Sequence, residues 1–278
     1  MVVIGLALAA TVCGALGTFL TKSITLRLPM WQAVGPLFAL NALLVVPLIP
    51  FGPTWKLLEP EVLTLHVASV ILLCASAACI FTLVDRGRPS GAAVGQALSP
   101  TATLLAAPLL LGTELAPLTV LAVLTLVSGA LIPLRGSFEG VSSLSAVALL
   151  ITLGGATGLL TVLTAMLAQR GVGLPETYVV RTAAAASVYA AIAWPRAVSL
   201  RDVPALAVRS SLITASFLLT ILAVQIGNVV VIQSILGSLP LMVIGIEWLR
   251  HRHRPDPTIV IGSVVASIGL AVLLAVTR

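Results

Sequence analysis

Two apolar runs meet at a short polar turn in residues 98–134, LSPTATLLAAPLLLGTELAPLTVLAVLTLVSGALIPL. The turn is Gly112-Thr113-Glu114, the run before it reaches back to Ser90, and the run after it extends from Pro117 to Leu134. Both runs approach the length of about 20 apolar residues that one helix needs to cross a membrane. Neither run alternates apolar and polar residues as the strands of a membrane barrel do. The stretch therefore predicts two membrane-spanning helices joined by a tight turn.

The whole chain has the composition of a membrane protein. Of its 278 residues, 59% are hydrophobic and 9% are charged, whereas about 25% of an average soluble domain is charged. The net charge of +6 comes from short clusters between apolar runs, which argues against a nucleic-acid-binding surface. The three cysteines lie inside apolar runs without CxxC spacing, so we expect packing residues and no metal site. We expect a multi-pass protein of the plasma membrane without a cofactor.

Apolar runs of similar length recur along the chain and predict ten transmembrane helices. They cover Val2–Leu20, Trp31–Pro50, Thr64–Val84, Ser90–Leu111, Pro117–Leu134, Ala146–Ala168, Thr177–Trp194, Leu206–Ile226, Val229–Leu249 and Thr258–Val276. The polar linker 135–145 divides the chain into a first half, residues 1–134, and a second half, residues 146–278. Because each half holds an odd number of helices, the two halves enter the membrane from opposite sides. The expected fold is an all-α membrane protein built from two inverted-topology repeats of five helices.

The two halves share residues at a fixed offset of 140. This offset pairs Gly14 with Gly154, Pro100 with Pro240, and Gly129 with Gly269. Each proline falls in the middle of its apolar run, where it removes a backbone hydrogen bond and predicts a kinked helix. A single membrane proline is often merely tolerated, but prolines at matched positions favour a function.

Three short motifs resemble those of EamA-type carriers in the drug/metabolite transporter superfamily. They are Ser99-Pro100, the stretch from Leu111 to Leu118, and Ser128-Gly129-Ala130. The second half keeps Ser238, Pro240, Gly262 and Gly269 but lacks the short Gly-Glu turn. The resemblance implies a ten-helix carrier of small metabolites, amino acids or drugs. The small multidrug members of the superfamily use a glutamate in their first helix, and residues 2–20 hold none.

Neutral polar side chains in the middle of the apolar runs are the first candidates for binding a solute. Ionisable groups deep in a membrane are costly and usually functional, but these runs hold few. We predict substrate-binding roles for the neutral residues Thr11, Gln96, Ser99, Thr161, Gln233 and Ser234. For each hydroxyl the alternative is a hydrogen bond to its own helix backbone or across a helix interface. The two glutamines must face protein or water, because hydrocarbon leaves an amide unsatisfied.

Arg181 is the one cation set well inside an apolar run. Its side chain could extend to the membrane surface, pair with Glu176, or bind a carboxylate of the substrate. A second basic feature is the loop that holds Arg250, Arg252 and Arg254. Its arginines alternate with two histidines and would repel a metal ion, so we predict contact with anionic lipid head groups.

The distribution of basic residues predicts the orientation in the membrane. The loops on the side of the termini hold Lys56, Arg170 and Arg278, together with Arg181 if it reaches that surface. The opposite side holds eleven basic residues: Lys22, Arg27, Arg86, Arg88, Arg135, Arg196, Arg201, Arg209, Arg250, Arg252 and Arg254. Short loops rich in Lys and Arg stay in the cytoplasm, so both termini are expected outside. The family resemblance implies the reverse.

These features together predict a secondary transporter of a small metabolite or drug-like solute, working by alternating access. No carboxylate is placed in the middle of the membrane for proton coupling, and the runs lack the acids, bases and metal ligands of an enzyme. Two alternatives remain open: an accessory membrane protein that transports nothing, and a flippase of a lipid-linked intermediate. The sequence does not indicate the oligomeric state.

Overall fold

The computed structural model describes residues 2–52, 55–86, 89–132, 144–192, 199, 201–251 and 257–276. All regular elements in these ranges are helices: α1 (Val2–Thr25), α2 (Met30–Val45), the 3-10 helix η1 (Val46–Phe51), α3 (Pro60–Arg86), α4 (Pro89–Ala97), α5 (Ser99–Leu111), α6 (Pro117–Leu131), α8 (Leu144–Gln169), α9 (Leu174–Ile192), α10 (Val203–Ile226), α11 (Val229–Leu236), α12 (Leu239–His251) and α13 (Pro257–Val276). Most of the predicted linker 135–145 lies outside the described residues.

Helices form along the apolar runs because a helix satisfies its own backbone polar groups in an apolar environment. Within the described residues, six segments are long and apolar enough to cross a membrane. They are Val2–Thr25, Met30–Phe51, Pro60–Asp85, Val147–Gln169, Val203–Ile226 and Val229–Ile246. Shorter apolar segments follow in α4–α5, α6 and α13. The prediction of an all-helical membrane protein is confirmed at this level.

The runs that hold Pro100 and Pro240 are each interrupted just before the proline, at the two positions where the sequence predicts kinks. Helix α4 ends at Ala97 and α5 restarts at Ser99, while α11 ends at Leu236 and α12 restarts at Leu239. Each proline becomes the second residue of a new helix, a position where its missing N–H group costs nothing.

A serine hydroxyl occupies each helix break. Ser99 donates to the Gln96 carbonyl at 2.6 Å, and Ser238 donates to the Ile235 carbonyl at 2.6 Å. Both carbonyls lie in the last turn of the preceding helix, where backbone acceptors lack partners within the helix. The hydroxyls therefore satisfy backbone carbonyls where one helix ends and the next begins.

The predicted turn after residue 111 is confirmed. Gly112 has a φ of 64° and a ψ of 24°, and its N–H group donates to the Pro108 carbonyl at 3.1 Å. This left-handed conformation ends a helix at little cost when the residue is glycine. Helix α6 then begins at Pro117, where proline is favoured in the first turn.

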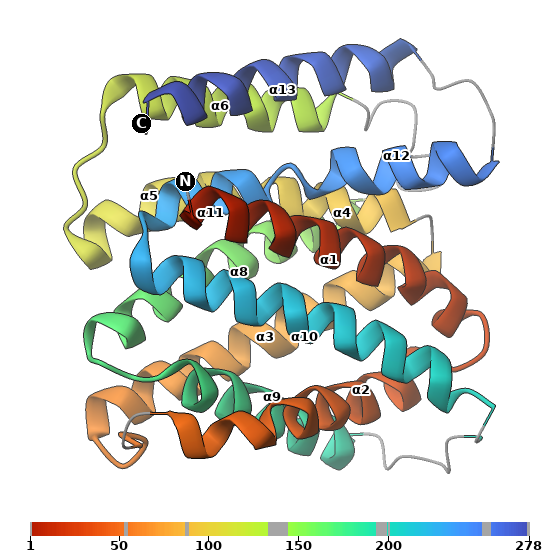
Figure 1. Cartoon of the computed structure of the whole chain (residues 1–278). Helices are drawn as coiled ribbons and strands as arrows, with labels where there is room; N and C mark the ends of the chain where they lie inside the picture. Colours follow the sequence, from red (N-terminus) through yellow and green to blue (C-terminus); the bar gives the residue numbers. More distant parts are fainter. Residues whose placement is uncertain are drawn as a thin grey trace.

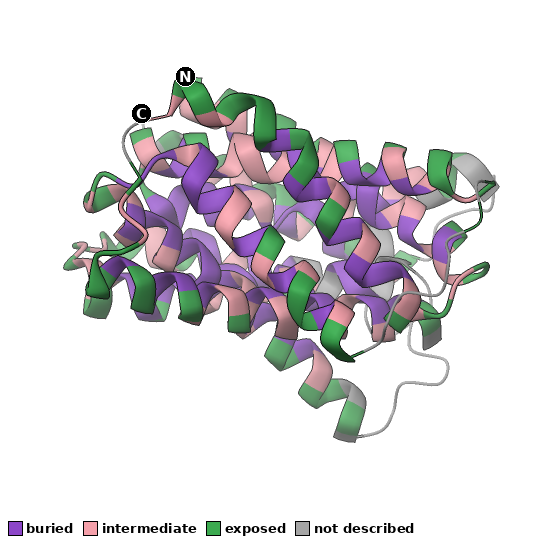
Figure 2. Ribbon diagram, turned by 90° about the horizontal axis from the view of Figure 1, so that it is seen from below, coloured by how far each residue is buried: buried purple, intermediate pink, exposed green. Residues whose placement is uncertain are grey.

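The helices pack in pairs that join the two predicted halves of the chain (Figure 1). Helix α6 packs on α13, α2 on α9, α1 on α10, and α3 on α8. The ends of α1 and α13 that carry the termini lie on the same side of the molecule (Figure 1). Buried residues concentrate on the faces where helices meet, and exposed ones lie on the outer faces (Figure 2).

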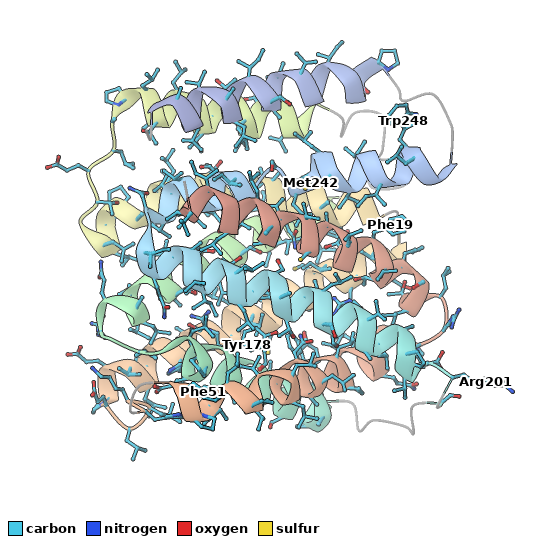
Figure 3. The ribbon with its side chains drawn as sticks, viewed as in Figure 1. Phe19, Phe51, Tyr178, Arg201, Met242 and Trp248 are labelled. Carbon is cyan, nitrogen blue, oxygen red and sulfur yellow. The ribbon has the colours of Figure 1, made fainter. Side chains whose placement is uncertain are left out.

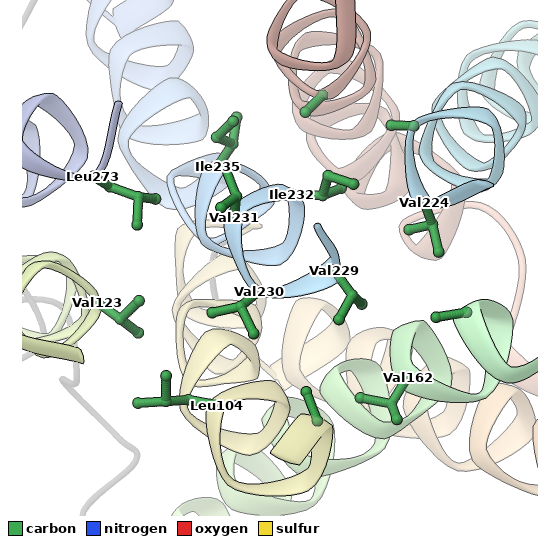
Figure 4. Close-up of a cluster of buried hydrophobic side chains, with 14 of the residues drawn as sticks. Leu104, Val123, Val162, Val224, Val229, Val230, Val231, Ile232, Ile235 and Leu273 are labelled. Carbon is green, nitrogen blue, oxygen red and sulfur yellow. The ribbon is translucent and has the colours of Figure 1, made fainter. Parts of the chain in front are cut away.

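The largest apolar cluster surrounds α11, one of the two short helices before a break. Val229, Val230, Ile232 and Ile235 of α11 are buried there, and Leu104 of α5 also belongs to the cluster (Figure 4). Exposed Leu and Ile side chains such as Leu121 and Ile151 lie on the outside instead. A buried interior and an apolar outer surface are what a helix bundle needs in lipid.

Candidate functional site

Gln233 joins three helices through hydrogen bonds in the interior. Its Nε2 donates to the Ser99 hydroxyl of α5 at 2.5 Å, and its Oε1 accepts from the Thr161 hydroxyl of α8 at 2.6 Å. The Gln233 side chain lies on α11 and the residue is 1% exposed. Three of the predicted binding residues therefore lie together. Their role as substrate ligands stays a prediction.

This network lies where the two helix breaks approach each other. A Cβ atom on Gly237 would lie 2.5 Å from Cγ of Pro100, so the backbone after α11 contacts the proline ring at the start of α5. Helix α8 approaches the same point, because the Thr103 hydroxyl donates to the Gly158 carbonyl at 3.1 Å. The close approach of backbones brings the side chains of Ser99, Thr161 and Gln233 within hydrogen-bonding distance.

The other neutral candidates bond mainly to backbone or stand apart from the network. Thr11 donates to the Ala7 carbonyl of its own helix at 2.7 Å and lies 3.4 Å from the Ile235 carbonyl. Ser234 donates to the Val230 carbonyl of its own helix at 2.7 Å. Gln96 is half-buried, and its backbone carbonyl accepts from Ser99. These contacts follow the alternative stated for hydroxyl groups in apolar helices.

Arg181 lies in the interior and does not extend to the membrane surface. The residue is 3% exposed, and its Nη1 donates to the Thr164 hydroxyl of α8 at 2.8 Å. Its Nε and Nη2 are buried and have no hydrogen-bond partner among the described residues. Thr164 follows Thr161 by three residues, or about 4.5 Å along the axis of α8. Helix α8 therefore connects the Gln233 network with Arg181.

Glu176 does not pair with Arg181, although this pairing was one of the predicted alternatives. Both carboxylate oxygens of Glu176 accept from the Lys56 backbone N–H at 3.0 Å, and Oε1 lies 3.9 Å from Nε2 of His66. Among the described residues, no carboxylate oxygen lies within 4.0 Å of the Arg181 guanidinium. Five residues along a helix place two side chains on different faces, which explains the separation.

Glu176 is a buried carboxylate, but it lies at a helix end and not in the middle of the apolar run, where the sequence predicts none. The residue is 2% exposed and lies in the first turn of α9. A carboxylate is favoured near the N-terminus of a helix, and the segment around Lys56 covers this one. Its position near a helix end separates it from the Gln233 network.

A small cavity adjoins Arg181, with room for about one water molecule. Its walls come from α2, α3, α9 and α10, and they hold Phe38, Asn41, Leu73, Tyr178, Arg181, Thr182 and Phe217. Oδ1 of Asn41 is buried without a hydrogen-bond partner. The Tyr178 hydroxyl donates to the Thr214 hydroxyl of α10 at 3.0 Å, and Figure 3 shows Tyr178 in the interior of the molecule.

Sequence reasoning missed most of the residues that line this cavity. Tyr178, Arg181 and Thr182 are three and four residues apart, and such residues share one face of a helix. This spacing could have indicated a polar face on α9. Nothing comparable distinguishes Phe38 or Phe217 from the apolar residues around them.

Some predicted contacts lie outside the described part of the chain. Arg252 and Arg254 fall in the undescribed range 252–256, and no side-chain position is described for Arg250. Within the described residues there is no group of three or more His, Cys, Asp or Glu side chains that could hold a metal ion.

The fold resembles that of solved structures. In total, 29 chains match, and one of them, described as "Crystal structure of protein", superposes with a TM-score of 0.75 at 17% sequence identity. The match covers 99% of this chain and 96% of the other. At this identity the likeness concerns the fold alone. No curated protein matches the sequence.

The sequence itself matches the model of the EamA-like transporter family over residues 1–135. The match includes the helix break at Ser99-Pro100 and the turn at Gly112. These are the motifs on which the resemblance rested. Residues 1–135 of this chain therefore match the EamA-like transporter family, which is consistent with the drug/metabolite transporter superfamily.

Proposed function

We propose that this chain is a secondary transporter that moves a small metabolite or drug-like solute across the plasma membrane by alternating access. The observation that carries the proposal is the contact between two broken helices, with Gln233 bonded to Ser99 of one half and Thr161 of the other. In carriers built from inverted repeats, the substrate site typically lies where such discontinuous helices of the two repeats meet.

The packing of the helices supports two inverted repeats of five spans in this carrier. In the two halves, α1 corresponds to α8, α2 to α9, α3 to α10, and α6 to α13. The α1–α10 contact is therefore equivalent to the α8–α3 contact, and the α2–α9 and α6–α13 contacts each join two corresponding helices. A methyl group on Gly129 would lie 2.2 Å from the Ala266 backbone nitrogen, and one on Gly269 would lie 2.5 Å from that of Leu126. The offset of 140 relates these two contacts, as expected for a two-fold axis between α6 and α13.

The hydrogen bonds of Gln233 suit a neutral binding site. An amide both donates and accepts, so it can exchange its bonds with Ser99 and Thr161 for bonds to a solute. Neither hydroxyl is then left without a partner, because Ser99 also donates to the Gln96 carbonyl and Thr161 to the Thr157 carbonyl at 3.2 Å. Breaking the bridge between the halves would therefore carry a modest energetic cost.

Solute flux in proteoliposomes tests the proposal. A thermal-shift screen of the purified protein against amino acids, nucleosides, sugars and cationic drugs first selects a solute, and its radiolabelled form is then measured for uptake. We expect saturable flux that Gln233→Met abolishes. Gln225→Met is the matched control, because Gln225 is half-buried on α10 and makes only a long contact, 3.5 Å, with the Val172 carbonyl.

The opposite results would identify a different kind of protein. Absence of flux for every solute, by protein that is folded in the vesicles, would indicate an accessory protein. Flux that survives Gln233→Met would place the binding site elsewhere in the chain.

A further inference from the structure

Arg181 carries a buried charge with no carboxylate oxygen within 4.0 Å among the described residues. Its guanidinium is buried on α9, and its one hydrogen bond is to the neutral Thr164 hydroxyl. Glu176 on the same helix is held by the Lys56 backbone N–H. A buried charge without a counter-charge is costly, so an anion from outside the described chain would lower the free energy of this site.

The unsatisfied atoms of Arg181 have the geometry of an anion site. Nε and Nη2 lie on one edge of the planar guanidinium, and both lack a partner. That edge presents two parallel N–H groups, which match the two oxygens of one carboxylate. Arg181 also lines the cavity.

The remaining walls of the cavity define what surrounds the anion. Phe38, Leu73 and Phe217 are apolar, and Asn41 provides an amide with an unpaired Oδ1. An apolar wall beside a guanidinium favours an organic anion with a hydrocarbon body over a strongly hydrated inorganic ion. The cavity is small in this conformation, so such a solute must displace side chains as it enters.

A second buried cation adds to the positive potential of this region. Arg209 of α10 donates from Nε to the Thr21 hydroxyl at 2.8 Å, and its guanidinium lies 5.0 Å from the centre of the Phe81 ring. These partners are neutral, as is that of Arg181. Two buried cations with neutral partners attract anions into the bundle.

We infer that Arg181 binds the carboxylate of the transported solute, so that the substrates of this carrier are small monocarboxylates with an apolar body. The cavity lies between α2 and α3 of the first half and α9 and α10 of the second. A solute bound there contacts both halves, as alternating access requires. This inference rests on the proposed function.

Thermal unfolding of the purified protein in detergent tests the anion site without requiring transport. The probes are 4-methylpentanoate, the neutral 4-methylpentanamide, and chloride, each titrated in a buffer that contains neither carboxylates nor chloride. We expect the carboxylate alone to raise the melting temperature in a saturable way. An equal response to the amide would overturn the role of the charge, and an equal response to chloride would overturn the assignment to an organic carboxylate.

Substitution of Arg181 locates the site. Arg181→Met should weaken the apparent affinity for 4-methylpentanoate at least about tenfold. Without ligand it should leave the melting temperature unchanged or higher, because it removes an uncompensated charge while Thr164 keeps its bond to the Leu160 carbonyl. A lower melting temperature with an intact carboxylate response would show that Arg181 is only structural.

Two further variants complete the test. Arg170→Met is the matched control, because Arg170 is partly exposed and pairs with Glu61 at 3.1 Å outside the cavity; its response should equal that of the wild type. If Arg181→Met does not fold, Arg181→Lys tests the role of the guanidinium instead. It keeps the charge but loses the two parallel donors, so the carboxylate response should weaken severalfold, and an unchanged response contradicts the inference.

Flux measurements separate this inference from the proposed function. Saturable uptake of a neutral solute that Arg181→Met leaves unchanged would overturn the substrate class while the carrier function stands. Binding of 4-methylpentanoate through Arg181, without flux of this or any other solute, would overturn the carrier function while the anion site stands.

Discussion

At the scale of the residue, Gln233 couples positions that lie far apart in the sequence. Its bond to Ser99 crosses 134 residues, and its bond to Thr161 crosses 72. Neutral hydrogen bonds of this kind stabilise a protein by about 1 kcal/mol each. The bonds hold α5, α8 and α11 together in this conformation and would have to break if the halves separate.

A double-mutant cycle measures the bond between Ser99 and Gln233. We expect Ser99→Ala and Gln233→Met each to lower the free energy of unfolding, and the double variant to lose about 1 kcal/mol less than the sum, because both changes remove the same bond. Unfolding in mixed micelles provides the values. Ser234→Ala is the control, since Ser234 bonds to its own helix; it should add to Ser99→Ala without coupling. Additivity of Ser99→Ala and Gln233→Met would contradict the bond.

At the scale of the element, the backbones of α6 and α13 lie so close together that there is no room for a Cβ atom at Gly129 or Gly269. Gly129 faces the backbone of Ala266, and Gly269 faces the backbone of Leu126. The atoms in the way belong to backbone, so no rotation of a side chain makes room. Small residues at such positions let helices pack tightly in a membrane, and Figure 1 shows these two helices side by side at one edge of the molecule.

Alanine substitution tests this helix pair. We expect Gly129→Ala and Gly269→Ala each to destabilise the protein by about 1–3 kcal/mol, because a methyl group forces the helices apart. The matched control is Gly155→Ala on α8, where a Cβ atom would meet nothing within 4 Å. It should be neutral or stabilising by up to about 1 kcal/mol, since alanine favours helix more than glycine. Thermal unfolding in one detergent compares the three, and equal effects would contradict the close packing.

At the scale of the whole molecule, polar contacts group the loops into two sides. Lys56 on the first side donates from Nζ to the Arg170 carbonyl at 2.6 Å. On the other side, Lys22 donates to the Val84 carbonyl at 2.8 Å, and Arg27 lies 3.8 Å from Asp202. The grouping agrees with the loops used in the count of basic residues, except that Arg209, which was counted on the opposite side, is buried on α10. The side opposite the termini holds the excess.

Reporter fusions test the predicted orientation. Alkaline phosphatase, which is active only outside the cytoplasm, should be active when fused after Arg278, because the basic loops hold the opposite side in the cytoplasm. A fusion in the turn between α8 and α9, on the same side as the termini, should give the same result. A fluorescent protein that matures only in the cytoplasm is the complementary reporter, and its fluorescence at Arg278 would reverse the orientation.

The sequence predicts the helices and the positions of the two interruptions at Pro100 and Pro240. Apolar runs of sufficient length leave few alternatives to a helix, so the positions of α1, α3 and α10 follow from composition. Across Leu98 the apolar character continues without interruption, and a proline is compatible with either a bend or a restart. At this interruption the second half of the chain contacts the first, since Gly237 lies against the Pro100 ring.

The candidate site was predicted in part, for a similar reason. Amides in an apolar run are few and conspicuous, so Gln233 could be chosen from the sequence. The side chains of Phe38 and Phe217 become part of a cavity only through the packing of α2 against α9 and α10. Local sequence does not reveal which apolar residues face a cavity and which face lipid. Glu176 likewise forms no ion pair with Arg181, because its carboxylate accepts from the Lys56 backbone N–H. Local sequence does not reveal that the segment around Lys56 lies there.

In the proposed carrier, the isolated charge of Arg181 also bears on the kinetics of the transport cycle. A loaded carrier has its guanidinium neutralised, whereas an unloaded one must reorient with a bare cation in an apolar interior. Reorientation without cargo would therefore be the slow step. Counterflow should then outpace net uptake, with solute on the far side of the membrane accelerating entry from the near side.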